Sequence, residues 1–302
     1  MPTWPRPRAA RGVRARALRP EPVPEPLVTS ARSADAGELL RFCQAAPVDA
    51  ALLGEHVEAL PRYAFTRDQL LCVRTSEGLD GLCWTGGNVV PFRVAPRAAP
   101  ALAEAVRSGR RRYSSIVGPA EDVLALWEQL RQDGPVPREV REDQPSMMID
   151  HDPLLPPEPK VRVCTSADLD VLLPACVAMF TEEVGYSPLQ SGGSYERRIR
   201  SLVDGGRALA WIETTASGPQ VIFKAEIGTV AFGVAQVQGV WVHPDYRGRG
   251  FAATGMAAVV AHTRERMAPV VSLYVNSYNT RALAAYDAVG FRRVGTYATV
   301  LF

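Results

Sequence analysis

The stretch GVWVHPDYRGRGFAATGMAAVV, residues Gly239 to Val260, decides the fold of the second half of the chain. Its apolar, β-branched start predicts a strand, and its alanine-rich end predicts a helix. Pro244, Gly248 and Gly250 lie at the joint between them. The N–H groups of a helix's first turn point outward and carry partial positive charge, so this joint suits an anion such as a pyrophosphate. The alternative is a tight turn in which the glycines serve geometry alone.

Composition predicts a globular chain with a large core. The 302 residues are 47 % hydrophobic, and their length suggests two domains. The formal net charge of +2 gives no reason to expect nucleic acid or an anionic membrane as partner. The five cysteines are scattered and form no CxxC pair, which argues against a disulfide framework or a metal site and favours a reducing cytoplasm. No apolar run reaches the roughly 20 residues that cross a bilayer.

Proline clusters divide the chain into four segments. Residues 1–30 are rich in proline and arginine, and we expect a disordered tail; RNA contact through its arginines is the alternative to a solvated tail. Residues 31–150 form a first domain, and residues 151–160, which include DPLLPPEPK, form a stiff linker. Residues 161–302 form the second domain.

The second domain predicts a mixed sheet flanked by helices, an α/β (α+β) fold. Thr165 and Asp168 have the spacing of a capping box before the helix LDVLLPACVAMF. The segments ALAWIET, QVIFKAEIGTVAF and AQVQGVWVH predict antiparallel strands, and a helix over about 250–266, the strand VVSLYV, a helix over about 280–289 and a last strand follow. The first domain repeats this plan weakly, which suggests an internal duplication.

VHPDYRGRGFA resembles the acyl-CoA signature of the GCN5-related N-acetyltransferases, the GNAT superfamily. That signature is Arg or Gln, two residues, Gly, one residue, then Gly or Ala, and Arg247, Gly250 and Ala252 occupy those positions. The family's second signature is met by NTRALAAYDAVGF, with Asn279 and, seven residues later, Tyr286. The resemblance covers about residues 161–302. With its degenerate first half, the chain is similar to a bacterial tandem subgroup whose N-terminal part is a domain of unknown function.

The resemblance implies where acetyl-CoA, or another acyl-CoA, would bind. In this family the fourth and fifth strands splay apart and the pantetheine arm lies in the gap, along the backbone of the fourth strand. By position that strand includes Val240, Trp241 and Val242. The amides that would cradle the pyrophosphate belong to Arg247, Gly248, Arg249, Gly250, Phe251 and Ala252. Asn279 would bond the cofactor arm; an ordinary N-cap is its alternative role.

The implied activity is acetyl transfer to a primary amine, a small molecule or a peptide, by direct attack. Tyr286 would protonate the departing thiolate, and the spacing of seven residues places it on the helix face of Asn279. A core aromatic is the alternative for Tyr286. A catalytically weak acyl-CoA sensor, from a different functional class, is the alternative to the enzyme.

The proton acceptor departs from the family pattern. Many relatives carry a Glu early in the fourth strand, where this chain has Gln236. Glu226 on the preceding strand is the nearest substitute, since strand alternation places it opposite Phe223, Ala225 and Ile227; a salt bridge is its alternative role. Glu182 and Glu183 occupy the loop that lines the acceptor pocket in relatives, and either attract a cationic amine or form a solvated acidic turn.

The first half lacks every one of these features. Its APRAAPALA replaces HPDYRGRGFA, with no glycine and two prolines that remove amide donors. Ala120 stands at the place of Asn279, and Trp127 at that of Tyr286. We therefore expect this half to bind no CoA and to complete the sheet or wall the acceptor site.

Overall fold

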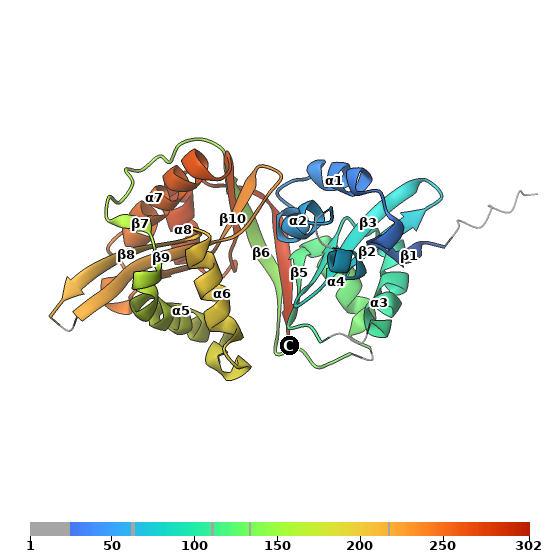
Figure 1. The fold of residues 1–302 in the computed structure, drawn as a ribbon, viewed down its shortest axis with the longest axis horizontal. Coiled ribbons are helices and arrows are strands. Elements are labelled where there is room, and N and C mark those ends of the chain that lie inside the picture. The colour runs from blue at the N-terminus through green and yellow to red at the C-terminus, as the bar shows by residue number, and fades with distance from the viewer. Residues whose placement is uncertain (1–24, 62–63, 110–111, 133, 217) are drawn as a thin grey trace, which may run out of the picture.

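The computed structural model shows two lobes joined by one continuous mixed sheet (Figure 1). It describes residues 25–61, 64–109, 112–132, 134–216 and 218–302. Twelve strands in these residues run in the order β1-β2-β3-β4-β5-β12-β6-β11-β10-β9-β8-β7. Helices cover both faces of the sheet in each lobe, as the mixed α/β pattern predicts.

The first half follows the plan of the second, element by element. Its strands and helices are β1 (Leu27–Ser30), α1 (Ala36–Gln44), α2 (Ala51–Glu58), β2 (Leu70–Thr75), β3 (Gly78–Thr85), β4 (Val89–Phe92), α3 (Ala99–Ser108), β5 (Ser115–Pro119), α4 (Ala120–Leu130) and β6 (Glu139–Ile149). The second half contains β7 (Val161–Val163), α5 (Leu169–Val184), α6 (Ser194–Asp204), β8 (Ala208–Thr215), β9 (Gly218–Ala231), β10 (Val234–Val242), α7 (Phe251–Arg266), β11 (Val270–Tyr274), α8 (Thr280–Val289) and β12 (Arg292–Leu301).

The two halves exchange their last strands. β6, from the first half, lies between β11 and β12 and pairs antiparallel with both. β12, from the second half, pairs antiparallel with β5 on its other edge. In Figure 1 these two strands run side by side between the lobes. Each half is therefore closed by a strand of the other half.

Most predicted elements of the second half are present. The capping box joins Thr165 and Asp168, and Arg162 pairs with the same carboxylate at 2.7 Å. One helix, α6, was not predicted, although Tyr195, Ile199 and Leu202 follow a helical period. The linker forms no helix or strand, and it packs on the second half through Leu154 N–H to Val289 O (2.9 Å).

The predicted tail boundary needs a correction. Residues 27–30 were assigned to the tail, but they form β1, which pairs antiparallel with β2. Val28 packs against the core of the first half, and this burial offsets the cost of ordering the segment. Residues 1–24 of the predicted tail lie outside the described residues.

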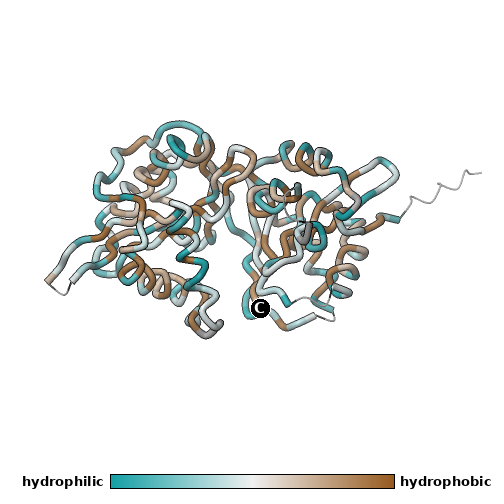
Figure 2. Tube along the Cα trace, in the orientation of Figure 1, coloured by the Kyte–Doolittle hydropathy of each residue, from teal (hydrophilic) through white to brown (hydrophobic). Residues whose placement is uncertain are grey.

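Hydrophobic segments lie inside both lobes, where helices meet the sheet (Figure 2). In the second half, α7 and α8 cover one face of the sheet and α5 and α6 cover the other. Gly255 lets α7 approach β9, since a Cβ there would lie 2.8 Å from the ring of Phe223. Within the described residues, no helix has the length and apolar character needed to cross a membrane.

Candidate active site

The fourth and fifth strands of the second half diverge at Gln236. β10 pairs in parallel with β11 only from Val234 to Gln236, and beyond this point the β11 edge that faces β10 has no paired strand. A bulge follows in β10 between Gln238 and Trp241, with Gly239 at φ 59°. Such a bulge bends the strand and strengthens its twist, so it widens the opening.

The diverging part of β10 presents backbone groups to the gap. His243 N–H donates to Ile222 O (2.9 Å) on β9, and backbone groups of alternate residues face opposite edges of a strand. The groups of Val242 and Val240 therefore face the gap, where Arg247 Nε already donates to Val242 O (2.9 Å). The intervening Trp241 points to the α5 side and is buried.

The glycine turn begins α7 with an open anion cradle. A short 3-10 helix η6 (Pro244–Tyr246) follows β10, and Arg247 to Gly250 then lead into α7. Gly248 and Gly250 have φ of 76° and 81°, and a Cβ on either glycine would meet no atom within 4 Å. Among the described residues, the N–H groups from Gly248 to Ala252 have no hydrogen-bond partner. A phosphate fits here, where donors are unpaired and the space is open.

Arg247 and Arg249 stabilise the conformation of this turn and also give it positive charge. Arg247 Nη2 pairs with Glu182 Oε2 at 2.6 Å, which ties the loop to the end of α5. Arg249 Nη2 donates to Asp245 O (3.0 Å), and its guanidinium lies 5.3 Å from the ring centre of Tyr246. Both side chains stay exposed enough to meet a further anion.

Tyr286 lies on α8, and Asn279 is the N-cap residue directly before this helix. Asn279 is exposed and caps the helix, since its Oδ1 accepts from Ala282 N (3.2 Å). Tyr286 is 6 % exposed, and its ring packs against Phe291. Burial raises the pKa of Tyr286 above its usual range, and the charge of Glu183 raises it further. The phenol therefore keeps its proton at neutral pH and is available as an acid.

Glu226 lies on the face opposite Phe223, Ala225 and Ile227, as the alternation predicts, but α5 covers this face. Its Oε1 pairs with the fully buried Lys224 at 2.5 Å, and its Oε2 accepts from Gln238 (3.2 Å). Burial alone would raise the pKa of Glu226, but the ammonium of Lys224 more than offsets this and the pKa is lowered.

The carboxylate of Glu226 also touches the bulge. A Cβ at Gly239 would lie 3.1 Å from its carboxyl atoms, so glycine permits this approach. The salt bridge considered for Glu226 is thus present, and it holds an ionised carboxylate against the diverging strand.

The other three predicted residues have partners of their own. Glu182 accepts from Trp241 Nε1 (3.3 Å) in addition to its ion pair with Arg247. Glu183 pairs with Arg141 of β6 and accepts from Asn276 Nδ2 (3.0 Å) at the end of β11. Gln236 is buried and hydrogen-bonds Tyr297. The prediction of a loop here is wrong, because both glutamates lie in the last turn of α5; they are ion-paired and do not form the freely solvated acidic turn.

A buried polar network from the first half supports the far wall of the gap. Gln144 of β6 donates to Asn276 Oδ1 (2.8 Å) and accepts from Thr299 Oγ1 (2.6 Å). Asn276 in turn contacts Glu183. No local pattern in the sequence predicts these contacts, because they depend on the exchange of β6.

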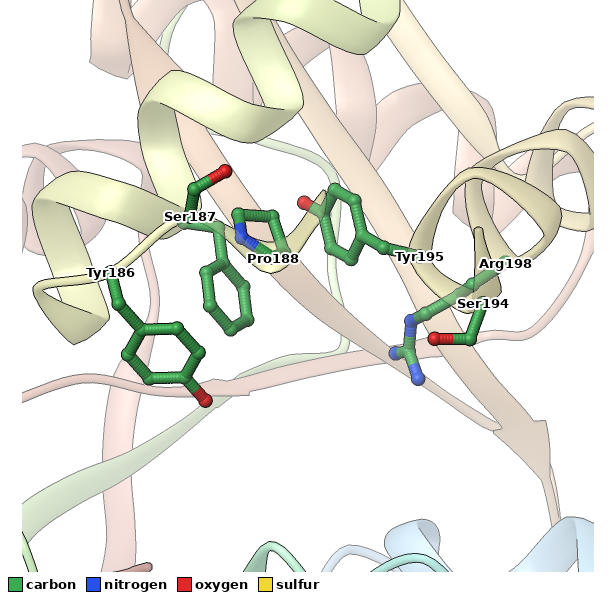
Figure 3. Close-up of a pocket in the computed structure, with 7 residues that line it drawn as sticks. Tyr186, Ser187, Pro188, Ser194, Tyr195 and Arg198 are labelled. Atoms are coloured by element: carbon green, nitrogen blue, oxygen red, sulfur yellow. The ribbon is translucent and has the colours of Figure 1, made fainter. Parts of the chain in front are cut away.

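A pocket of about 440 Å³ opens between the end of α5 and the start of α6 (Figure 3). Three aromatic side chains line it, and the Phe180 ring meets Tyr186 and Tyr195 edge-on at 5.6 and 5.4 Å. Arg198 is the cation of the lining, and its Nη2 donates to Gln238 Oε1 (3.1 Å). Because Gln238 also donates to Glu226, the pocket adjoins the bulge of β10 beside the gap.

The corresponding joint of the first half is closed. A 3-10 helix η3 (Pro96–Ala98) runs directly into α3, with no counterpart of the RGRG turn. Asp122 of α4 accepts from Arg93 N (2.7 Å) and Val94 N (2.8 Å), just after β4. A Cβ at Gly118 of β5 would lie 3.0 Å from Pro91 O of β4, so these two strands stay close together. Trp127 packs in the core against Phe302.

Comparisons with known proteins agree with this geometry. The sequence model described as Acetyltransferase (GNAT) family matches residues 190–291, which include the cradle, the gap and α8. The second half is similar to the GNAT family over these residues. A model described as a domain of unknown function (DUF4081) matches residues 69–172, so the GNAT half follows a degenerate partner, as in the tandem subgroup. A search of curated proteins found no match.

Solved structures share the fold over nearly the whole chain. A GCN5-related N-acetyltransferase from Sphaerobacter thermophilus is 20 % identical with a TM-score of 0.58, and the alignment covers 92 % of this chain and 96 % of that one. A Drosophila protein has a TM-score of 0.60 at 14 % identity, with coverage of 92 % and 98 %. A GNAT-family acetyltransferase from Colwellia psychrerythraea has 0.52 at 12 %, with coverage of 91 % and 99 %. At these identities the likeness concerns the fold alone.

Proposed function

We propose that the chain is an acetyl-CoA-dependent N-acetyltransferase with one active site, in the gap between β10 and β11. The observation that carries this proposal is the open run of amides from Gly248 to Ala252 beside that gap. These amides would hold the pyrophosphate, the backbone of Val240 and Val242 would hold the pantetheine arm, and exposed Asn279 would bond the arm from α8. Acetyl-CoA supplies an activated acetyl thioester.

Two side chains would handle the protons when an amine attacks and the C–N bond replaces the C–S bond. Tyr286 would give its proton to the sulfur: it carries that proton at neutral pH, and its raised pKa makes it a weak acid. Glu226 would take the proton of the amine, because it is the ionised carboxylate against the bulge. Its lowered pKa and its pairing with Lys224 make it a weak base, so we expect Glu226→Gln to lower kcat only about tenfold, below the usual range for general bases.

The test is acetyl-CoA-dependent thiol release with a panel of amines, on the full chain and on Tyr286→Phe. We expect the variant to lose about 10²-fold in kcat and to bind acetyl-CoA as tightly as the native protein. Tyr113→Phe is the matched control, because this tyrosine of the first half packs against Phe302 away from the gap. Binding of acetyl-CoA without turnover for any amine would contradict the enzyme and support the sensor.

A further inference from the structure

Arg198 lines the pocket between α5 and α6, and among the described residues it has no carboxylate partner. Two other arginines near the site are paired with acids, Arg141 with Glu183 and Arg247 with Glu182. Among the described residues no carboxylate lies within 4 Å of Arg198, whose hydrogen bond goes to the neutral amide of Gln238. The guanidinium is exposed and reaches the pocket from α6 (Figure 3). It can therefore bind an anionic group of a ligand.

The rest of the pocket is mostly apolar and aromatic. Phe180, Tyr186, Pro188 and Tyr195 line it together with Ser187 and Ser194, and among the described residues no acidic side chain does. Arg138, from the segment before β6, lies 4.4 Å from the ring centre of Tyr186 and adds a second positive charge at this wall. A polycation would be repelled by these positive charges. A ligand with an apolar group and an anionic group would contact the aromatic rings with the first and the guanidinium of Arg198 with the second.

Gln238 connects this cation to the proposed proton acceptor. Its Oε1 accepts from Arg198 and its Nε2 donates to Glu226, so one side chain separates a free cation from the ionised carboxylate at the bulge. A ligand with an amino group and a carboxylate matches this order of charges.

We propose that the acceptor is a free amino acid with an aromatic or large aliphatic side chain. Its carboxylate would bind Arg198, its side chain would lie among Phe180, Tyr186 and Tyr195, and its amino group would face the bulge at Gly239. This substrate class rests on the proposed function, because it identifies the acceptor of the same site. The chemistry at the amine is the acetyl transfer already described.

The test is calorimetric titration of the full chain with L-phenylalanine, L-phenylalaninamide and spermidine, with and without saturating CoA. We expect L-phenylalanine to bind at least about tenfold more tightly than the amide, which lacks the carboxylate. Arg198→Gln should weaken L-phenylalanine binding about tenfold and leave the amide nearly unchanged. Arg200→Gln is the matched control on the same helix, where Arg200 pairs with Glu196, and should change neither.

Equal binding of the acid and the amide, preference for spermidine, or no binding of L-phenylalanine would overturn the proposal. Acetyl transfer to other amines without L-phenylalanine binding would leave the proposed function in place and refute the acceptor class. The predicted binding pattern without acetyl transfer would support the pocket and refute the enzyme.

Discussion

The joints that follow β4 and β10 occupy the same place in the two halves and differ in whether their backbone amides have hydrogen-bond partners. After β10, the turn from Arg247 to Gly250 leaves successive N–H groups open at the start of α7. After β4, the chain passes directly into α3, and a carboxylate of the protein itself, Asp122, binds the free amides. The second joint leaves its amides open, whereas at the first joint a carboxylate of the chain accepts from the amides of Arg93 and Val94.

The strands beside these joints differ in the same sense. β10 leaves β11 after Gln236, whereas Gly118 and Pro91 keep β5 and β4 in close contact. Without a gap, the first half has no place for a pantetheine arm. Its contribution is structural: it supplies β6 to the wall of the site, and Glu55 and Glu58 of α2 bond the backbone of the β9–β10 hairpin. The two halves share the same order and packing of elements. Among the described residues, a run of open amides after the fourth strand is present in the second half alone.

The titration of Asp122 should make the stability of the folded chain depend on pH. Burial raises the pKa of Asp122 to about 6, and the two amide donors lower it only in part. Since the folded state then binds the proton more tightly than the unfolded state, the contribution of this group is present below about pH 4 and is lost as pH rises through about 6. Relative to Asp122→Asn, the native free energy of unfolding should fall by about 2–3 kcal/mol between pH 4 and pH 7.

Denaturant unfolding of both proteins across this pH range measures the difference, in which all other titrating groups cancel. A constant difference would show that Asp122 does not hold its proton in the folded state. The amide donors of Arg93 and Val94 would then stabilise the carboxylate enough to cancel the effect of burial on its pKa.

Substitution of Gly250 should weaken acetyl-CoA binding, with a smaller change in free energy than the titration of Asp122. Its φ of 81° is costly for any residue with a Cβ, so Gly250→Ala should shift the turn and weaken acetyl-CoA binding about tenfold. Gly78→Ala is the matched control, because Gly78 also has a positive φ with open space around it but lies in the β2–β3 hairpin. Thermal melts should show similar losses of stability for both variants, about 1 kcal/mol. Equal acetyl-CoA affinities would contradict the cradle.

The sequence predicted the local parts of this molecule well. The strand, glycine turn and helix around Arg247 and the placement of Tyr286 on α8 are confirmed, because turn chemistry and periodicity encode them within a few residues. Glu226 was correctly placed on its strand face, but its burial under α5 and its pairing with Lys224 depend on tertiary packing. Its catalytic role, like that of Tyr286, stays a prediction.

Long-range features were not predictable from one sequence. The exchange of β6 and β12 leaves no periodic signal, since either strand could pair within its own half. Asp122 is an ordinary first-turn acid of α4 until the fold brings it to the amides of Arg93 and Val94. Arg198 differs from these, because the helical period of α6 is visible in the sequence, whereas the pocket that Arg198 lines forms only in the folded chain.

We propose that the second half binds acyl-CoA and that the first half does not. Calorimetric titration of the full chain with acetyl-CoA tests it most directly, with the stoichiometry as the decisive quantity. We expect one site per chain, with an affinity that Gly250→Ala weakens and Asp122→Asn leaves unchanged. Two sites per chain, no binding by the folded protein, or one site that is lost with Asp122 and retained with Gly250→Ala would contradict it.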